Sequence, residues 1–354
     1  MSKLRDIYHT ALPEKLPQQF RIFLGDKELV YEKRQSLRYG VNPHQQAALY
    51  SPAGKKAVMG NLKELKTGKQ GLSQTNVEDM DRALNILKYF DAPACAVMKH
   101  LNPTGVAVAR KNDTLREVYL RARDSDSQAA FGSIVGFNCP VDGDTAGEIV
   151  STFVEGVVAP RYEQGAVEKF GEKRNMRVVQ IANLDCLPKF AGGETGYLCL
   201  SVLGDGSIVV SDPYTTKIRR KDDLQPVTRR TPTEREFEDM LFAWYVCANV
   251  RSNGIVLAKD GCTVSVGAGQ QDRVTAVKIA VDKALKWHAE SLRGSVLASD
   301  GFLPFRDSID LIAKYDVSAV IQPGGSVRDQ EVVDACDQYG IAMVFTGERC
   351  FAHF

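Results

Sequence analysis

The sequence predicts an α/β fold, in which helices cover the faces of a β-sheet. Short apolar runs alternate with amphipathic stretches of about 10–15 residues, which is typical of strands alternating with helices. The order strand–strand–helix–strand–helix–strand–helix–strand also occurs twice, at an offset of about 160 residues. A chain of 354 residues has the length of roughly two domains. We therefore expect two similar α/β units in tandem.

The first series of elements begins with two apolar runs joined by a turn, at 94–110. The stretches that follow it read in turn as helix, strand, helix and strand, at 114–126, 130–138, 145–155 and 156–160, and the series closes with a further helix and a strand, the strand at 176–183. The second series begins in the same way, at 254–270. Its later stretches read in turn as helix, strand, helix and strand, at 272–290, 294–305, 308–316 and 318–323, and this series also closes with a further helix and a strand, the strand at 341–347.

Composition along the chain divides it into four parts. Residues 1–36 form an extended N-terminal arm, with one strand in RIFLGDKELVYEK. Two larger units occupy 37–185 and 233–354. Between them, 186–232 is rich in glycine, proline and charge and reads as a hairpin with a connector. Its run RRKDDLQPVTRR could be a nucleic-acid patch, but the interleaved acids and prolines favour a solvated linker.

Composition also excludes several classes of protein. Lys and Arg number 45 against 44 Asp and Glu, and this balance argues against a nucleic-acid or membrane-surface protein. No apolar run approaches the roughly 18 residues of a membrane span, and the start of the chain lacks the apolar core of a signal peptide. The eight cysteines include no C-x-x-C pair, and the five histidines show no metal-ligand spacing. We expect a cytoplasmic protein with free buried thiols and no metal.

Lys99 and His100 form the most reactive pair that the sequence offers. They end an apolar strand and enter a turn that we assign to Asn102, Pro103 and Gly105. A histidine there can accept a proton near neutral pH, and the lysine charge can stabilise an oxyanion. The alternative is a solvated lysine beside a histidine that caps the turn.

Other loops carry polar groups that suit ligands. RYG with NPHQ, at 38–45, offers an arginine for a phosphate and a tyrosine ring, or is an ordinary structural loop. GAGQQDR, at 267–273, leads from a strand into a helix but lacks the dinucleotide and P-loop patterns. QPGGSVRD, at 322–329, offers backbone donors and Ser326 as a cap. SDGFLPFRD, at 299–307, fits either a flat-ring pocket with an acid, Asp307, or core residues with an N-cap.

Taken in order, these segments resemble one family, the transformylase domain of the bifunctional proteins that join aminoimidazole carboxamide ribonucleotide (AICAR) transformylase to inosine monophosphate cyclohydrolase. The resemblance runs from about Leu37 to Arg349. It rests on ten blocks: LRYGVNPHQ, LSQTN, VMKHLNPTGVAV, AFGSIVGFN, VEGVVAP, RSNGIVLAK, GAGQQDRV, SDGFLPFRDSID, QPGGSVRD and TGER. It implies two tandem α/β/α domains like those of cytidine deaminases, and a homodimer with shared active sites. Because only 36 residues precede Leu37, we expect a transformylase without the cyclohydrolase domain.

The resemblance also implies roles for individual residues. The proton acceptor falls on His100 and the lysine that stabilises the transition state on Lys99. Contacts to AICAR fall on Arg38, Tyr39, Asn76, Gly132, Glu155, Asn253, Phe302 and Arg349. Contacts to folate fall on Arg273, Val274, Pro304, Asp307, Ser326 and Val327. The segment DSQAAFG, at 126–132, departs from the family pattern, which puts its folate contacts in doubt.

The implied reaction is formyl transfer from 10-formyltetrahydrofolate to the 5-amino group of AICAR, giving the formamido ribonucleotide (FAICAR) and tetrahydrofolate. General-base catalysis can supply about 10²–10⁴-fold, so the reaction requires neither a metal nor a covalent nucleophile. Zinc-dependent deamination is excluded because the chain lacks H-x-E with P-C-x-x-C. Two alternatives stay open: a non-catalytic relative that binds AICAR, and formyl transfer from a different donor.

Overall fold

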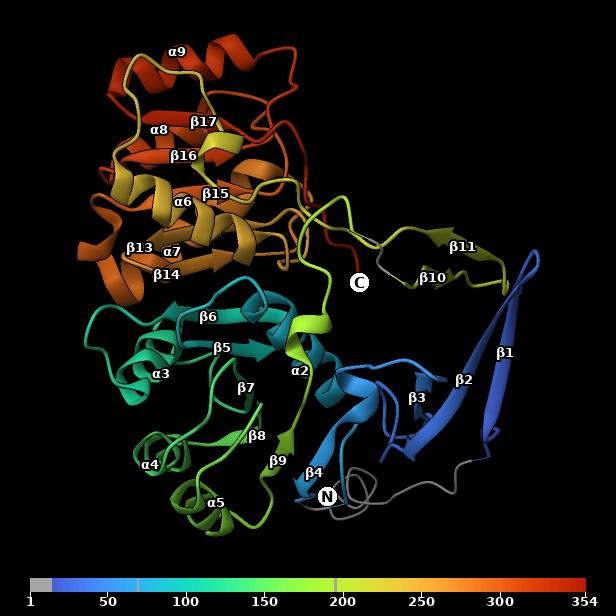
Figure 1. Cartoon of the computed structure of the whole chain (residues 1–354). Coiled ribbons are helices and arrows are strands. Elements are labelled where there is room, and N and C mark those ends of the chain that lie inside the picture. The colour runs from blue at the N-terminus through green and yellow to red at the C-terminus, as the bar shows by residue number, and fades with distance from the viewer. Residues whose placement is uncertain (1–14, 69, 194–195) are drawn as a thin grey trace.

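The protein has an α/β fold built on one large mixed sheet, as the sequence predicts. The structure, a computed structural model, describes residues 15–68, 70–193 and 196–354. Within these ranges a 12-stranded sheet has the order β12-β17-β16-β15-β13-β14-β6-β5-β7-β8-β9-β4. Figure 1 shows its two halves side by side, with the green and cyan first half below the orange and red second half.

The strands of the first half lie between residues 63 and 180: β4 (Lys63–Lys66), β5 (Ala94–Lys99), β6 (Asn102–Val108), β7 (Ser133–Phe137), β8 (Val154–Ala159) and β9 (Arg177–Gln180). Its helices are α2 (Gln74–Leu87), α3 (Leu115–Asp124), α4 (Gly143–Ser151) and α5 (Gln164–Gly171). The strands of the second half are β12 (Gln225–Pro226), β13 (Ile255–Lys259), β14 (Cys262–Gly267), β15 (Val296–Ser299), β16 (Ala319–Gln322) and β17 (Ala342–Phe345). Its helices are α6 (Glu234–Cys247), α7 (Arg273–Leu292), α8 (Asp307–Ala313) and α9 (Asp329–Tyr339).

The two halves repeat one strand order outward from their junction. That order is β6-β5-β7-β8-β9-β4 in the first half and β14-β13-β15-β16-β17-β12 in the second. The halves join where β6 pairs with β14, with Ala107 opposite Cys262. This pairing is antiparallel, so strand direction reverses from one half to the other. An approximate two-fold rotation about an axis perpendicular to the sheet has this effect.

Helices cover both faces of the sheet. On one face, α2 and α6 pack over the central strands, and this core includes the fully buried Trp244. On the other face, the first half has α3, α4 and α5, and the second half has α7, α8 and α9. Sequence analysis missed α2 and α6, although each begins with a capping box, at Ser73 and Thr233.

The N-terminal arm and the connector each form a ribbon outside the main sheet. The arm contains β1 (Gln19–Leu24) and β2 (Lys27–Ser36), and β3 (Ala48–Pro52), which follows the arm, completes its three-stranded sheet. The predicted single strand over RIFLGDKELVYEK is wrong, because Gly25, at φ 60°, opens a two-residue turn that folds it into the β1–β2 hairpin. The connector contains the hairpin of β10 (Cys199–Val202) and β11 (Ile208–Ser211). Figure 1 shows both ribbons projecting away from the sheet.

The expected state of the thiols holds only in part. All eight cysteines are free, and Cys95, Cys247, Cys336 and Cys350 are buried. Cys186 and Cys199 are exposed, because Cys199 lies on the projecting hairpin rather than in a core strand.

No helix among the described residues is long and apolar enough to span a membrane. In the same residues, no group of three or more His, Cys, Asp and Glu side chains is arranged to hold a metal ion.

Candidate active site

Most of the predicted site residues lie along one edge of the 12-stranded sheet, which we call the site edge. In the first half, β5 ends at this edge and β6, β7, β8 and β9 begin there. In the second half, β13 begins at the same edge and β14, β15, β16 and β17 end there. The antiparallel register between β6 and β14 places these strand ends on one side. Segments far apart in the sequence therefore converge at one edge.

Lys99 and His100 lie at the centre of the site edge. Lys99 pairs with Asn102, so the turn between β5 and β6 contains only His100 and Leu101. Assigning the turn to Asn102, Pro103 and Gly105 was therefore wrong, because these residues belong to β6. His100 is exposed, and its backbone φ is 53°. The tight turn brings the imidazole to the sheet edge beside the lysine.

A buried carboxylate that the sequence analysis missed holds this turn. Asp79, on α2, is 5% exposed, and its Oδ1 accepts the backbone N–H of Leu101 at 2.7 Å. Burial raises the pKa of Asp79 to about 6, and the nearby negative charges of Glu155 and Glu78 add to the rise. The signal for it was an acid on the buried face of a capped helix.

Arg38 and Tyr39 pack against the N-terminus of α2. The backbone N–H of Arg38 donates to Leu72 O at 2.8 Å, and the N–H of Gln74 donates to Tyr39 O at 3.0 Å. The guanidinium of Arg38 lies over the Tyr39 ring, 4.4 Å from its centroid, and also donates to the phenol oxygen at 2.7 Å. The loop thus brings a cation and a hydroxyl to the site edge.

Asn76 and Glu155 meet beside this loop. Asn76 Nδ2 donates to Glu155 Oε2 at 3.0 Å. Arg177, a second missed residue, lies 4.0 Å from the same carboxylate oxygen. Burial lowers the pKa of Arg177, and the neighbouring charge of Arg38 lowers it further. Guanidinium groups suit anions, so we call Arg38 and Arg177 the anion site. In the sequence, Arg177 was hidden at the start of an apolar strand.

Lys99 reaches the start of β7. Its Nζ donates to the backbone carbonyl of Phe131 at 2.7 Å. The next residue, Gly132, has a φ of 74°, and its N–H donates to Phe153 O at 2.7 Å. The rings of Phe131 and Phe153 lie 5.1 Å apart and line a cavity of about 560 Å³. Lys99 thus contacts the backbone of a residue that lines this cavity.

The second half contacts the His100 turn through the segment before β13. The backbone N–H of Arg251 donates to Asn102 Oδ1 at 2.9 Å. Asn253 follows, and its N–H and Nδ2 both donate to Gln270 O, at 3.1 and 2.8 Å. These bonds hold Asn253 at the site edge, close to the turn.

Arg273 and Arg349 lie near one aromatic ring. Arg273 is 7% exposed and forms a short ion pair with Asp300, a third residue that the sequence analysis missed. The centroid of the Phe351 ring lies 4.8 Å from the guanidinium of Arg349 and 6.0 Å from that of Arg273. Arg349 is exposed, whereas Arg273 is held inside the protein. Val274, in the first turn of α7, is half-buried.

The remaining folate candidates form a separate group at the ends of β15 and β16. Phe302 and Phe305 are each 46% exposed, and Pro304 lies between them. The guanidinium of Arg328 lies 5.0 Å from the Phe305 ring centroid and links this loop to Ser326 and Val327. In the described part of the chain, no hydrogen bond or ion pair joins this group to Lys99 or His100.

Neither residue proposed as a helix cap takes that position. The N-cap of α8 is Arg306, and Asp307, the first helical residue, accepts the N–H of Ser308 at 2.7 Å. The N-cap of α9 is Arg328, and Ser326 Oγ accepts its N–H at 3.1 Å. Both helices begin one or two residues away from the expected caps.

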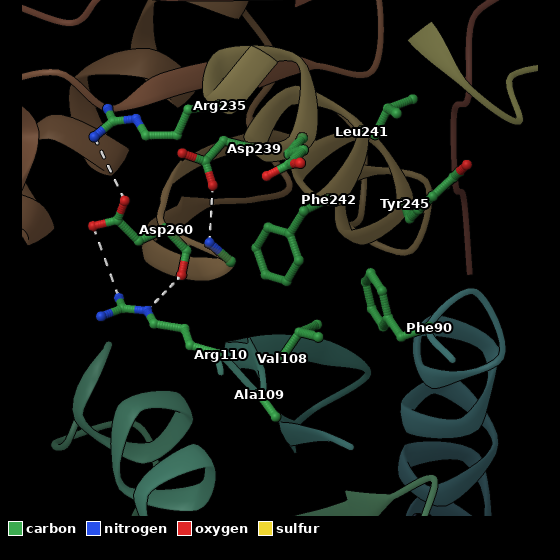
Figure 2. Close-up of a pocket in the computed structure, with 12 residues that line it drawn as sticks. Phe90, Val108, Ala109, Arg110, Arg235, Asp239, Leu241, Phe242, Tyr245 and Asp260 are labelled. Carbon is green, nitrogen blue, oxygen red and sulfur yellow. Dashed lines mark hydrogen bonds and ion pairs between the residues drawn. The ribbon is translucent and has the colours of Figure 1, made fainter. Parts of the chain in front are cut away.

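A cavity of about 700 Å³ opens at the opposite edge of the sheet and contains none of the predicted site residues. Figure 2 shows Phe90, Phe242 and Tyr245 at its aromatic end. At its other end Asp260 pairs with Arg235 and Arg110, at 3.5 and 3.8 Å. This cavity lies next to the turn between β13 and β14.

Comparison with known proteins shows that this chain is similar to bifunctional purine biosynthesis proteins. Residues 6–283 match the model of a family described as the AICARFT/IMPCHase bienzyme. The chain is 43% identical over 345 residues to the bifunctional purine biosynthesis protein PurH of Persephonella marina, and 42% identical over 332 residues to that of Aquifex aeolicus. These matches cover 97% and 94% of the chain but 62% of each relative. The chain thus spans less than two thirds of their length.

Proposed function

Because the chain belongs to the AICARFT/IMPCHase bienzyme family, we propose that it transfers a formyl group from 10-formyltetrahydrofolate to the 5-amino group of AICAR. The products are FAICAR and tetrahydrofolate. One observation carries this proposal: the Lys99–His100 turn lies at the same sheet edge as the anion site of Arg38 and Arg177. A proton acceptor and a phosphate site on one surface suit a phosphorylated amine substrate.

The chemistry assigns a task to Lys99 and another to His100. The amine nitrogen bonds to the formyl carbon, and the bond from that carbon to folate N10 breaks. One proton leaves the amine and one arrives at N10, so a single base can carry it between them. The exposed His100 imidazole is that base, and the Lys99 ammonium stabilises the oxyanion of the tetrahedral intermediate.

The anion site and its neighbours would hold the nucleotide. Arg38 and Arg177 supply positive charge for the phosphate, and Tyr39 adds a hydroxyl. Asn76 and Glu155 offer an amide and a carboxylate for the sugar hydroxyls. Gly132, Asn253, Phe302 and Arg349 complete the AICAR set from both halves of the sheet.

The folate would lie toward the second half. A pterin ring needs an apolar slot with a few fixed polar groups. Phe302, Pro304 and Phe305 offer apolar surface, and Asp307, Ser326 and Val327 lie in the two loops at its rim. Arg273 is buried against Asp300 and lies beside Gly301 of the same loop, and Val274 follows it in the first turn of α7.

A homodimer with shared sites would explain the projecting hairpin. Val202, Ile208 and Val209 on β10 and β11 are 70%, 57% and 50% exposed. A two-stranded ribbon has little stability alone, and exposed apolar side chains favour a protein partner. We propose that a second copy covers them. Light scattering that finds an active monomer of 39.0 kDa would contradict this.

We also propose that the halves arose by duplication of a cytidine-deaminase-like unit. The repeated strand order and the reversed direction at the β6–β14 junction support this. A solved deaminase that superposes on each half separately, with matching strand order, is the expected result of the structural comparison. A match to only one half would contradict the duplication.

The assay is release of tetrahydrofolate from 10-formyltetrahydrofolate in the presence of AICAR, followed spectrophotometrically. His100→Ala should lower kcat by at least about 10²-fold with little change in AICAR affinity. Asp260→Ala is the matched control, because Asp260 occupies the corresponding turn at the opposite edge. AICAR binding without turnover would favour a non-catalytic relative, and turnover only with another formyl compound would favour a different donor.

A further inference from the structure

The turn that carries His100 has a backbone conformation that its residues do not favour. His100 and Leu101 have φ values of 53° and 67°, both in the left-handed region. Two such residues between paired strands form a type I′ turn, for which Asn-Gly and Asp-Gly are preferred. A histidine followed by a leucine lacks the glycine that makes this conformation easy. Something outside the turn must therefore help to hold it.

The second half contains the same turn with a favoured sequence. Asp260 and Gly261, between Lys259 and Cys262, have φ values of 54° and 65°. The pairing of both hairpins also shifts register at corresponding positions before the turn. The two turns therefore share one geometry, and only the first pairs it with unfavourable residues.

A helix carboxylate contacts each turn in the same way. Asp79 accepts the backbone N–H of Leu101 at 2.7 Å. Asp239, at the corresponding position of α6, accepts the N–H of Gly261 at 2.8 Å (Figure 2). Both carboxylates are at least 95% buried, at 5% and 3% exposure. Each can therefore fix its turn rigidly.

We propose that Asp79 is the positioning residue for His100: its carboxylate holds the left-handed His100–Leu101 turn and so fixes the imidazole where the proton is transferred. This inference rests on the proposed function, because it gives the turn its chemical task. Asp79 has no direct contact with substrate in this role. It acts through the backbone, and its counterpart Asp239 performs the same structural task beside a turn that has no histidine.

The test compares Asp79→Asn with Asp239→Asn. In Asp79→Asn the Leu101 N–H can bond only to a neutral amide oxygen, and an NH₂ group turned toward it cannot accept at all, so the hydrogen bond that holds the turn is weakened or lost. We expect Asp79→Asn to lower kcat by about 10- to 100-fold, because small displacements of a catalytic group have effects of this size. The KM for AICAR should stay within about twofold, because the Arg38 and Arg177 site is intact. Asp239→Asn should leave both constants near wild type.

A rescue experiment separates positioning from general damage to the fold. Leu101→Gly supplies the residue that the turn geometry prefers, as Gly261 does in the second half. In the Asp79→Asn background, this change should recover at least about half of the decrease in log kcat that Asp79→Asn causes. In the wild-type background it should change kcat by less than about twofold. No recovery would overturn the proposal that Asp79 acts by holding the turn.

A second readout does not depend on turnover. In protein with labelled histidine, Asp79→Asn should shift the imidazole signals of His100, identified by their loss in His100→Gln, and Asp239→Asn should not. Wild-type kcat in Asp79→Asn, or unmoved His100 signals, would overturn the positioning role. If wild type releases no tetrahydrofolate but the signals still shift, the proposed function fails and the positioning of His100 stands.

Discussion

The two halves of the sheet present opposite strand ends to the site edge. The parallel strands β7, β8 and β9 begin there, whereas β15, β16 and β17 end there. This follows from the antiparallel β6–β14 junction, which reverses the second half. Corresponding segments of the two halves therefore lie at opposite edges. One turn, with His100, faces the candidate site, and its counterpart, with Asp260, faces the cavity at the far edge.

Comparing the β5–β6 and β13–β14 hairpins shows which groups hold such a turn and which occur only at the site edge. Lys259 Nζ donates to Arg293 O at 2.7 Å, as Lys99 Nζ does to Phe131 O. The residue after each carbonyl is a glycine with positive φ, Gly294 at 71° and Gly132 at 74°. The lysine, its carbonyl partner and the helix carboxylate thus occur in both halves. The two turn residues distinguish the turn at the site edge: His100 and Leu101 stand where the second half has Asp260 and Gly261.

This likeness gives a sharp test of Lys99. If its only task is the bond to Phe131 O, Lys99→Met and Lys259→Met should have similar effects on stability and none on turnover. We expect instead that Lys99→Met lowers kcat by about 10²–10³-fold, the usual cost of removing one donor from an oxyanion site. Lys259→Met should keep kcat within about twofold. Steady-state kinetics and urea unfolding of both variants measure the two effects.

The pH dependence of stability tests the buried carboxylate beside the first turn. Burial raises the pKa of Asp79 from 3.8 to about 6, with Glu155 and Glu78 as the nearest negative charges. The folded protein therefore holds this proton more tightly than the unfolded chain does. The contribution of Asp79 to the free energy of unfolding is therefore greatest below about pH 4. It falls by about 3 kcal/mol in total as the pH rises through 6.

Asp79→Asn lacks this titration and supplies the reference. The free energy of unfolding of wild type, minus that of Asp79→Asn, should fall between pH 4 and pH 7 in urea titrations. Burial also raises the pKa of Asp239, so Asp239→Asn should show a change in the same direction. If this difference does not vary with pH, ionisation of Asp79 costs no more free energy in the folded protein than in the unfolded chain.

Much of the fold was predictable because it depends on local patterns. Apolar runs such as ACAVMK marked the central strands, and the repeated order predicted the two series of elements. The α2 and α6 helices escaped because Asp79 and Asp239 interrupt their apolar faces. The continuous sheet was not predictable either. It depends on the β6–β14 pairing, which joins residues more than 150 positions apart.

Some residues of the candidate site were likewise predictable from the sequence, and others were not. Lys99 and His100 stood out because two basic residues ended an apolar strand. Their turn was misplaced because Asn102, Pro103 and Gly105 are favoured turn residues, whereas His100 and Leu101 adopt the turn against their preference. Arg177 and Asp300 were missed because their partners, Glu155 and Arg273, come from other segments. A sequence pattern cannot indicate such contacts.

The smallest expected effect is on the free energy of unfolding, when one turn loses its glycine and the other gains one. A Cβ at Gly261 would lie 3.8 Å from the nearest atom, the carbonyl oxygen of Val108, so Gly261→Ala meets no clash. Its cost comes from the backbone, which is held at a φ of 65°. We expect a loss of about 1 kcal/mol in the free energy of unfolding, after allowing for the lower entropy of the unfolded alanine chain.

Leu101→Gly should change the free energy of unfolding in the opposite direction. We expect a gain of about 0.5 kcal/mol, because the relieved backbone strain exceeds the lost contacts of a half-buried leucine. Urea midpoints of both variants decide the matter: changes of the same sign would mean that the first turn is not strained, and that His100 needs no support from Asp79.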